Sequence, residues 1–213
     1  MLAGRDELAG GTWLGIARDG RLAVVTNFRD GDSSEPGQTS RGELVTNFLA
    51  SGRGPAAWSA DVDGRRYAGF NLLTFDAGDA CYVSNRSSGP ETLADGVHGL
   101  SNHQLDTPWP KLSRTRSRFE ACVDAPEADP DDLFSLLGDR RQADDSTLPE
   151  TGVPIEWERL LSAPFIVHPD YGTRASTVVM VDREGEVYFE ERRFDPDGAM
   201  TGISEFRFRP RDN

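Results

Sequence analysis

The order of strand-like and helix-like segments constrains the fold of this chain more than any other feature. Two apolar runs, residues 12–17 and 22–27, flank an Asp-Gly turn and predict a hairpin. Both runs are apolar on both faces, which is typical of a sheet that is covered on both sides. Residues 69–75 and 80–85 predict two further short strands on either side of a second turn.

One helix is predicted between these two pairs of strands. Ser40 and Glu43 make a capping-box pattern, which favours a helix start at this point. The apolar residues behind it recur at helical spacing and fall on one face, and they are Leu44, Val45, Phe48 and Leu49.

The middle of the chain is predicted to be helical, and its end returns to strands. Residues 114–125 and 131–137 predict helices, whereas residues 176–182, 186–192 and 202–208 predict strands. This order differs from the regular βαβ alternation of a parallel sheet. Stacked antiparallel sheets covered by helices fit better, so we predict an α+β fold.

No internal repeat or interdomain linker interrupts the sequence, so residues 1–213 are predicted to form a single domain. The one soft boundary is the segment 139–151, which is polar, acidic and contains proline. We predict that this segment is a mobile surface loop.

The charge balance restricts the partners of the chain. Asp and Glu total 36 against 23 Lys and Arg, a formal net charge of −13, and Lys111 is the only lysine. Such a field repels nucleic acid and anionic membranes, so neither is predicted as a partner. The same composition fits a salt-loving host, because salt screens the self-repulsion. An ordinary acidic protein of a GC-rich genome is the alternative.

Hydropathy indicates where the protein resides. No stretch approaches the roughly 20 apolar residues that span a bilayer, so membrane insertion is not expected. No charged start followed by an apolar run is visible either, which predicts a cytoplasmic protein.

The cysteines and histidines do not predict a metal site. Cys81 and Cys122 form no CxxC spacing, and His98, His103 and His168 are scattered along the chain. We expect reduced, buried thiols and no metal.

Several short strings combine turn residues with polar groups where predicted strands end. As an ordered set they resemble the NRDE family, also called the transport-and-Golgi-organisation-2 family, from about residue 3 to the C-terminus. The strings are Gly10-Gly11-Thr12-Trp13-Leu14-Gly15, Thr26-Asn27-Phe28-Arg29, Ser40-Arg41-Gly42-Glu43-Leu44, Gly69-Phe70-Asn71-Leu72-Leu73, Ser84-Asn85-Arg86, Gly99-Leu100-Ser101-Asn102, Leu105-Asp106-Thr107-Pro108-Trp109-Pro110-Lys111 and Gly172-Thr173-Arg174.

The resemblance implies the four-layer αββα fold of N-terminal-nucleophile hydrolases. In those enzymes a chain-terminal Cys attacks an amide carbonyl, and its own α-amine acts as the base. Asn side chains and a backbone N–H stabilise the oxyanion, and an Arg orients the nucleophile. By resemblance, Asn85, Asn102 and Arg174 are the candidates for these supporting roles. Each also has a simpler interpretation, since Asn caps turns and Arg forms surface ion pairs.

The start of the chain departs from the family pattern. Relatives begin with a Met-Cys start, a first strand and an Asn-Arg-Asp-Glu string, whereas this chain begins Met1-Leu2. Arg5-Asp6-Glu7 lies too close to the Gly-Gly-Thr-Trp string to be that signature. We therefore expect the chain to begin inside its own fold, to lack the nucleophile and to be inactive as a hydrolase. Thr12 could substitute only if the chain were cleaved before it, and an ordinary entry into a strand is favoured for Gly10-Gly11-Thr12. Cys81 and Cys122 are the other conceivable substitutes, and packing roles are favoured for both.

The remaining candidates concern binding. Asn27 and Arg29 close a predicted strand and either face a pocket or shape a turn, and Asn71 is grouped with them as a ligand-binding residue. The predicted function is the binding of a small acyl or amide compound, with no cofactor. The alternatives are a non-catalytic haem or lipid carrier, in which His98 or His103 would ligate iron, and a mis-started fragment without function.

Overall fold

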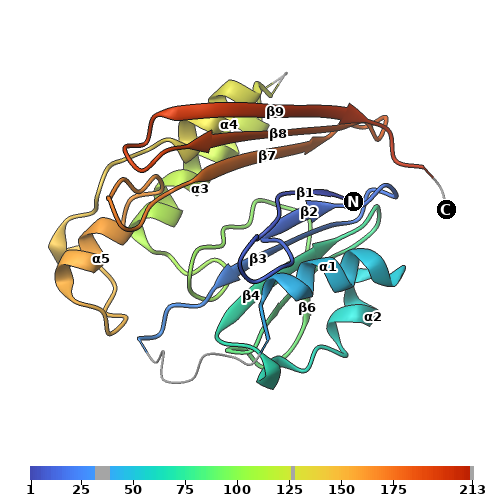
Figure 1. The fold of residues 1–213 in the computed structure, drawn as a ribbon, viewed down its shortest axis with the longest axis horizontal. Coiled ribbons are helices and arrows are strands. Elements are labelled where there is room, and N and C mark those ends of the chain that lie inside the picture. Colours follow the sequence, from blue (N-terminus) through green and yellow to red (C-terminus); the bar gives the residue numbers. More distant parts are fainter. Residues whose placement is uncertain (32–38, 126–127, 212–213) are drawn as a thin grey trace. The chain divides into compact units, whose positions relative to one another are not determined.

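The computed structural model describes residues 1–31, 39–125 and 128–211. In these residues the fold is mixed α/β, with two antiparallel sheets and five α-helices (Figure 1). The predicted α+β class with antiparallel sheets is thus confirmed. The chain divides into two compact units, the first built mainly from residues 1–96 and 100–107 and the second mainly from residues 108–210. Whether the two units together form a single domain, as the sequence predicts, stays a prediction.

The first unit holds a sheet whose strands are neighbours in the order in which they occur along the chain. These strands are β1 (Leu2–Ala3), β2 (Leu14–Ile16), β3 (Leu22–Asn27), β4 (Phe70–Phe75), β5 (Ala80–Ser84) and β6 (Glu91–Thr92). The connection from β3 to β4 carries α1 (Gly42–Ser51), α2 (Pro55–Ser59) and a 3₁₀ turn (Gly64–Arg66), and α1 and α2 pack on this sheet (Figure 1).

The core of the first unit lies between α1 and one face of its sheet. Leu44, Val45, Phe48 and Leu49 of α1 are all buried, so the predicted apolar face is confirmed. They belong to one apolar cluster with residues from several strands, among them Ala23, Phe70 and Leu72. Asn71 and Leu73 alternate with Phe70 and Leu72 along β4 and therefore point to the opposite face of the sheet.

The start of α1 corrects one prediction. Arg41 rather than Ser40 takes the N-cap position, and no side chain caps the helix. Ser40 Oγ instead accepts a hydrogen bond from the backbone N–H of Gly42 at 3.3 Å. The capping box is wrong because the backbone N–H of Glu43 donates to the backbone carbonyl of Ser40, at 3.1 Å, and not to the Ser40 hydroxyl.

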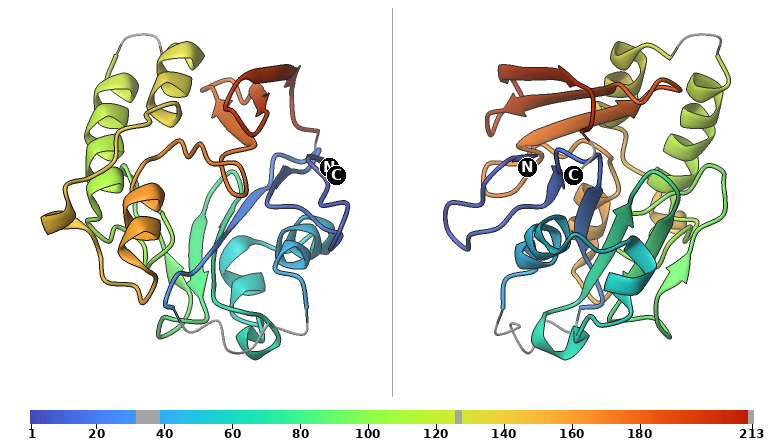
Figure 2. Two further views of the ribbon diagram at one scale, coloured as in Figure 1. Left: turned by 60° about the vertical axis from the view of Figure 1, so that its left-hand side comes forward. Right: turned by 90° about the vertical axis from the view of Figure 1, so that its right-hand side faces the viewer.

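The second unit holds the other sheet and three helices. The sheet is β7 (Ala175–Val181), β8 (Val187–Phe194) and β9 (Met200–Phe208), in that order. The helices are α3 (Pro110–Val123), α4 (Pro130–Leu137) and α5 (Ile155–Leu161). In both views of Figure 2, α3 and α4 lie side by side, and α4 also packs on β7. None of the helices in the described residues has the length and apolar character needed to span a membrane.

The segment 139–151 carries a 3₁₀ turn (Asp145–Thr147) and several polar contacts. Asp145 forms an ion pair with Arg159 at 2.6 Å. Glu158, which is buried, accepts a hydrogen bond from the backbone N–H of Thr151 at 2.9 Å. These contacts join the segment to α5, and its predicted mobility stays a prediction.

Asp139 at the start of that segment is surrounded by arginines. Its carboxylate lies 3.0 Å from Arg114 Nε, 3.0 Å from Arg141 Nη2 and 3.7 Å from Arg118 Nη1, and its side chain is only 8% exposed. Hydrogen bonds from Arg141 and, after these, from Arg114 hold the pKa of Asp139 well below its usual range, although burial opposes them.

We expect Asp139→Asn to lower the free energy of unfolding by about 1–2 kcal/mol at pH 7. The folded-state pKa lies below the unfolded-state value near about 3.9, so the stabilisation is complete above that pH. It is lost as the pH falls through the folded-state pKa. Urea unfolding of both proteins at pH 7, 5, 4 and 3 should show the difference shrinking only at the acidic end. A difference in the free energy of unfolding that stays constant from pH 7 to pH 3 would contradict the lowered pKa of Asp139.

Candidate functional site

The predicted site residues of the first unit gather at one end of its sheet. Thr26, Asn71 and Ser84 are direct neighbours across β3, β4 and β5. Asn27 is the last residue of β3, and Asn85 follows the last residue of β5. We call the group Asn27, Arg29, Asn71, Asn85 and Asn102 the polar end of the first sheet.

Asn71 is completely buried, and its amide group is used inside the protein. Its Nδ2 donates hydrogen bonds to Thr26 Oγ1 at 3.2 Å and to the backbone carbonyl of His103 at 3.0 Å. Its Oδ1 accepts a hydrogen bond from the Tyr82 hydroxyl at 2.8 Å. Burial raises the pKa of Tyr82, which keeps this hydroxyl protonated as a donor. Asn71 therefore holds the segment around His103 against the sheet.

Asn85 has a comparable arrangement. Its Oδ1 accepts the backbone N–H of Phe70 at 3.0 Å, and its Nδ2 donates to the carbonyls of Gly64 and Tyr67, both at 3.0 Å. Gly64 is needed for this approach, because a Cβ there would lie 2.7 Å from the Cβ of Asn85. These bonds to backbone groups are the ones expected of an Asn that caps a turn, which is the simpler of the two roles predicted for Asn85.

Asn27, Arg29 and Asn102 are brought together from strings about 75 residues apart in the chain. Asn102 Nδ2 donates to the backbone carbonyl of Asn27 at 3.1 Å, and the backbone N–H of Arg29 donates to the carbonyl of Asn102 at 2.7 Å. The side chain of Asn27 is exposed, and those of Arg29 and Asn102 are half-buried. These three residues can therefore meet a ligand from solvent.

Arg41 is a further residue of this region that the sequence interpretation missed. Its Nη1 donates to the carbonyl of Gly69 at 3.1 Å, and that same carbonyl accepts the backbone N–H of Phe28 at 2.9 Å, next to Asn27 and Arg29. Burial lowers the pKa of Arg41, and no ion pair joins it to a carboxylate of the described residues. The signal was present in the string Ser40 to Leu44, which was interpreted as a helix start.

Arg174 lies in the second unit, so it does not belong to the compact body that holds the polar end. Arg174 is exposed, and its backbone carbonyl accepts a hydrogen bond from the N–H of Phe194 at 2.9 Å. Gly172 gives its guanidinium room, because a Cβ there would lie 2.8 Å from Arg174 Nη1.

The candidate nucleophiles are packing groups in the structure. Thr12 is 1% exposed, and its hydroxyl donates to the carbonyl of Leu14 at 2.9 Å. Cys81 is also 1% exposed, and burial raises the pKa of its thiol, which disfavours the reactive thiolate. Cys122 packs against the apolar cluster of α4 and β7. The packing role predicted for Cys81 agrees with its complete burial, and Cys122 packs on its cluster while partly buried.

His103 also has a local role. Its Nδ1 lies 2.9 Å from Thr107 Oγ1, and its ring packs on Phe28 with centroids 4.9 Å apart. Over residues 1–31, 39–125 and 128–211, the structure brings no three His, Cys, Asp or Glu side chains together in an arrangement that could hold a metal ion.

Comparison with known proteins shows the relationship of this chain to a family. The family model described as Transport and Golgi organisation 2 matches residues 1–196. The Transport and Golgi organization protein 2 homolog of Bos taurus is 37% identical over 217 residues, covering 93% of this chain and 78% of the relative. The Mus musculus homolog is 36% identical with 94% and 78% covered, and the Drosophila melanogaster protein is 26% identical with 91% and 74% covered. The chain belongs to the Transport and Golgi organisation 2 family.

Proposed function

We propose that this protein binds a small acyl or amide compound at the polar end of its first sheet. The observation that carries the proposal is the convergence of Asn27, Arg29 and Asn102, which lie far apart in sequence, next to the half-buried Arg41. Asn amide groups can both donate to and accept from an amide bond, and Arg can bind a carboxylate in a bidentate manner. The ends of strands, where backbone groups and loop side chains meet, are common sites of binding.

The charge of the site supports an anionic ligand. Arg29 and Arg41 stand at the polar end of a protein whose formal net charge is −13. A ligand carboxylate at Arg41 would gain charge-assisted hydrogen bonds while the rest of the surface repels it. We therefore propose a compound that combines an acyl chain, an amide and a carboxylate.

Binding is favoured over hydrolysis by the described residues. Cys81 and Thr12 are buried, Cys122 is partly buried against an apolar cluster, and the amide groups of Asn71 and Asn85 already bond to the protein itself. An oxyanion hole built from them would require these bonds to break, at about 1–3 kcal/mol for each buried group. We further propose an N-terminal-nucleophile-hydrolase-like fold, with which the two antiparallel sheets and their helices are compatible.

The test is a calorimetric titration with N-octanoylglycine, which carries all three chemical groups. We expect saturable binding to the wild-type protein and no free glycine after prolonged incubation, as followed by NMR. Arg41→Gln removes one charged donor and should weaken binding roughly ten- to a hundredfold. Octanamide, which lacks the carboxylate, should bind weakly to both proteins.

Arg18→Gln is the matched control, because Arg18 is an exposed arginine in a turn of the same unit. It should leave the affinity for N-octanoylglycine unchanged. Equal affinity of the wild-type and Arg41→Gln proteins would refute the site. Release of glycine by the wild type would show that the protein hydrolyses the compound, and would refute binding without hydrolysis.

A further inference from the structure

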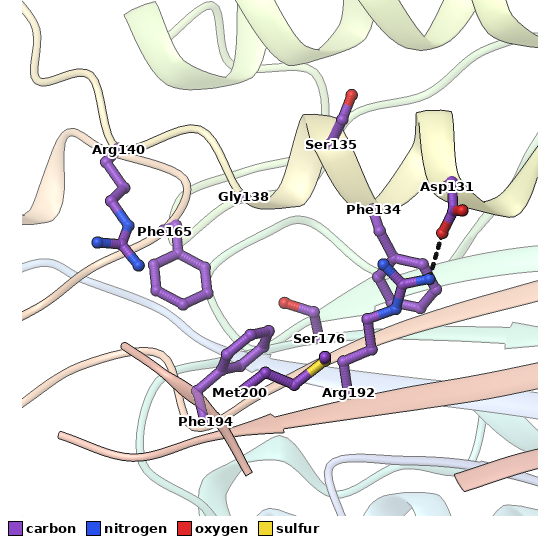
Figure 3. A pocket seen from close by; sticks show the side chains of 10 residues that line it. All are labelled: Asp131, Phe134, Ser135, Gly138, Arg140, Phe165, Ser176, Arg192, Phe194 and Met200. Carbon is purple, nitrogen blue, oxygen red and sulfur yellow. Dashed lines mark hydrogen bonds and ion pairs between the residues drawn. The ribbon is translucent and has the colours of Figure 1, made fainter. Parts of the chain in front are cut away.

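The second unit contains a pocket of about 340 Å³ that no predicted site residue touches. It opens beside α4, and the ends of β7, β8 and β9 contribute to it (Figure 3). This volume is near the lower limit of small-molecule sites, which run from about 300 to 1,000 Å³. The lining residues are Asp131, Phe134, Ser135, Gly138, Arg140, Phe165, Ser176, Arg192, Phe194 and Met200.

Three aromatic rings give the pocket an apolar interior. Phe165 and Phe194 stand perpendicular to one another with ring centroids 4.8 Å apart, and Phe134 lies further along the pocket (Figure 3). Phe134 and Phe165 are buried at 6% and 3% exposure, so their rings are held in place by the core. Rings fixed in this way favour a flat apolar ligand, because edge-to-face and offset stacking stabilise an aromatic pair beyond the effect of the buried apolar area.

The arginine at one end of the pocket is neutralised by its neighbours. Arg192 lies over the Phe134 ring, 3.7 Å from its centroid, and forms ion pairs with Asp131 and with the buried Glu190. Tyr188 donates a hydrogen bond to the same Glu190 carboxylate. Burial and, after it, this hydrogen bond raise the pKa of Tyr188 to about 12, so the hydroxyl keeps its proton. Arg192 is thus part of a satisfied network.

The arginine at the other end is in a different situation. Arg140 lies 5.0 Å from the centroid of Phe165, and its Nη2 donates to the carbonyl of Gly198 at 2.9 Å. In the part of the chain that the structure describes, no carboxylate forms an ion pair with it. The nearby Asp195 carboxylate instead accepts the backbone N–H groups of Asp197 and Ala199. Arg140 is exposed, so in a chain with 36 acidic residues against 23 basic ones its guanidinium meets both solvent and the apolar pocket and is available to an anion.

The turn after β8 fixes the position of Arg140. Gly198 has a φ of +74°, and a Cβ there would lie 2.8 Å from Arg140 Nη2 and 3.2 Å from a carbon of the Phe165 ring. Glycine at this position therefore allows the guanidinium to rest on the turn and over the ring. Ser176, which is buried and lies between Phe165 and Phe134 in Figure 3, adds a hydroxyl to the lining.

We propose that this pocket binds a planar aromatic carboxylate. The ring system lies among Phe134, Phe165 and Phe194, and the carboxylate accepts hydrogen bonds from the Arg140 N–H groups that do not bond to Gly198. This site is separate from the polar end of the first sheet and adds a second ligand class to the function proposed above.

The test uses 2-naphthoate and its uncharged analogue 2-naphthamide in calorimetric titrations of the whole protein. We expect 2-naphthoate to bind saturably below about 1 mM and 2-naphthamide to bind roughly tenfold or more weakly, because it lacks the charge. Arg140→Gln should remove this preference by weakening only the carboxylate. In amide NMR spectra, 2-naphthoate should shift the signals of Ser176 and Gly198.

Two control variants separate this pocket from other sites. Arg183→Gln changes an exposed arginine in the same unit, and Arg41→Gln changes the polar end of the first sheet; both should bind 2-naphthoate as the wild type does. The proposal is overturned if the two probes bind the wild type equally or if Arg140→Gln retains the preference. An absence of saturable binding up to about 1 mM would overturn it as well.

Discussion

Replacing Asn71 by leucine is expected to lower the free energy of unfolding by about 3 kcal/mol, although leucine keeps the number and the branching of the side-chain heavy atoms. Asn71 is 0% exposed, and its amide bonds to Tyr82, Thr26 and the carbonyl of His103. Leucine leaves the Tyr82 hydroxyl and the His103 carbonyl without these bonds, and each such loss costs about 1–3 kcal/mol when the group is buried. Urea unfolding followed by circular dichroism measures the loss.

Two further variants show whether the polar network is the cause. Asn47→Leu, on the exposed side of α1, should change the stability by less than about 0.5 kcal/mol. Adding Tyr82→Phe to Asn71→Leu should recover part of the loss, because the hydroxyl that has lost its Asn71 acceptor is then gone. If Asn71→Leu costs less than about 1 kcal/mol, Asn71 is not the structural support that its contacts indicate.

Much of the fold could be predicted because it depends on local patterns. The hairpin turn, the spacing of Leu44 to Leu49 and the alternation in the later strands each specify an element through nearby residues. The short helices α2 and α5, with 5 and 7 residues, were missed because they offer too few turns for a periodic pattern. The capping box failed because the Ser40 hydroxyl bonds to the N–H of Gly42, and the N–H of Glu43 bonds to the Ser40 backbone carbonyl instead.

The site was predictable only in part. The strings containing Asn27, Arg29 and Asn102 could be recognised, and the structure places the three residues together. The internal hydrogen bonds of Asn71 and Asn85 could not be predicted, because their partners belong to other strands and turns. The pocket beside α4 was missed for the same reason: Phe134, Phe165 and Phe194 come from separate segments without a shared motif.

A second large effect is expected at Arg21, which joins the β2–β3 hairpin to the end of α1. Its Nη1 donates to the carbonyl of Phe48 at 3.1 Å and its Nη2 to that of Leu49 at 3.0 Å, and its guanidinium lies 5.4 Å from the Phe48 ring centroid. Asp19 pairs with it at 2.9 Å. Burial alone would raise the pKa of Asp19, but the hydrogen bonds and charge of Arg21 lower it.

The last carbonyls of a helix have no partner within the helix, and a cation near them also meets the negative end of its dipole. No basic residue lies in the last turn of α1, so Arg21 supplies this role from the hairpin. We expect Arg21→Met to lower the free energy of unfolding by about 3 kcal/mol, because two charge-assisted hydrogen bonds are lost and the Asp19 carboxylate loses its cation.

Arg21→Lys should give an intermediate loss, since an ammonium group keeps the charge but cannot span two carbonyls with a planar fork. Arg18→Met, at an exposed position of the same turn, should leave the stability within about 0.5 kcal/mol of the wild type. Hydrogen exchange should then become faster in the last turn of α1 in Arg21→Met and remain unchanged in Arg18→Met. If Arg21→Met unfolds like the wild type, the end of α1 is held by its apolar contacts alone, and the buried guanidinium contributes no net stability.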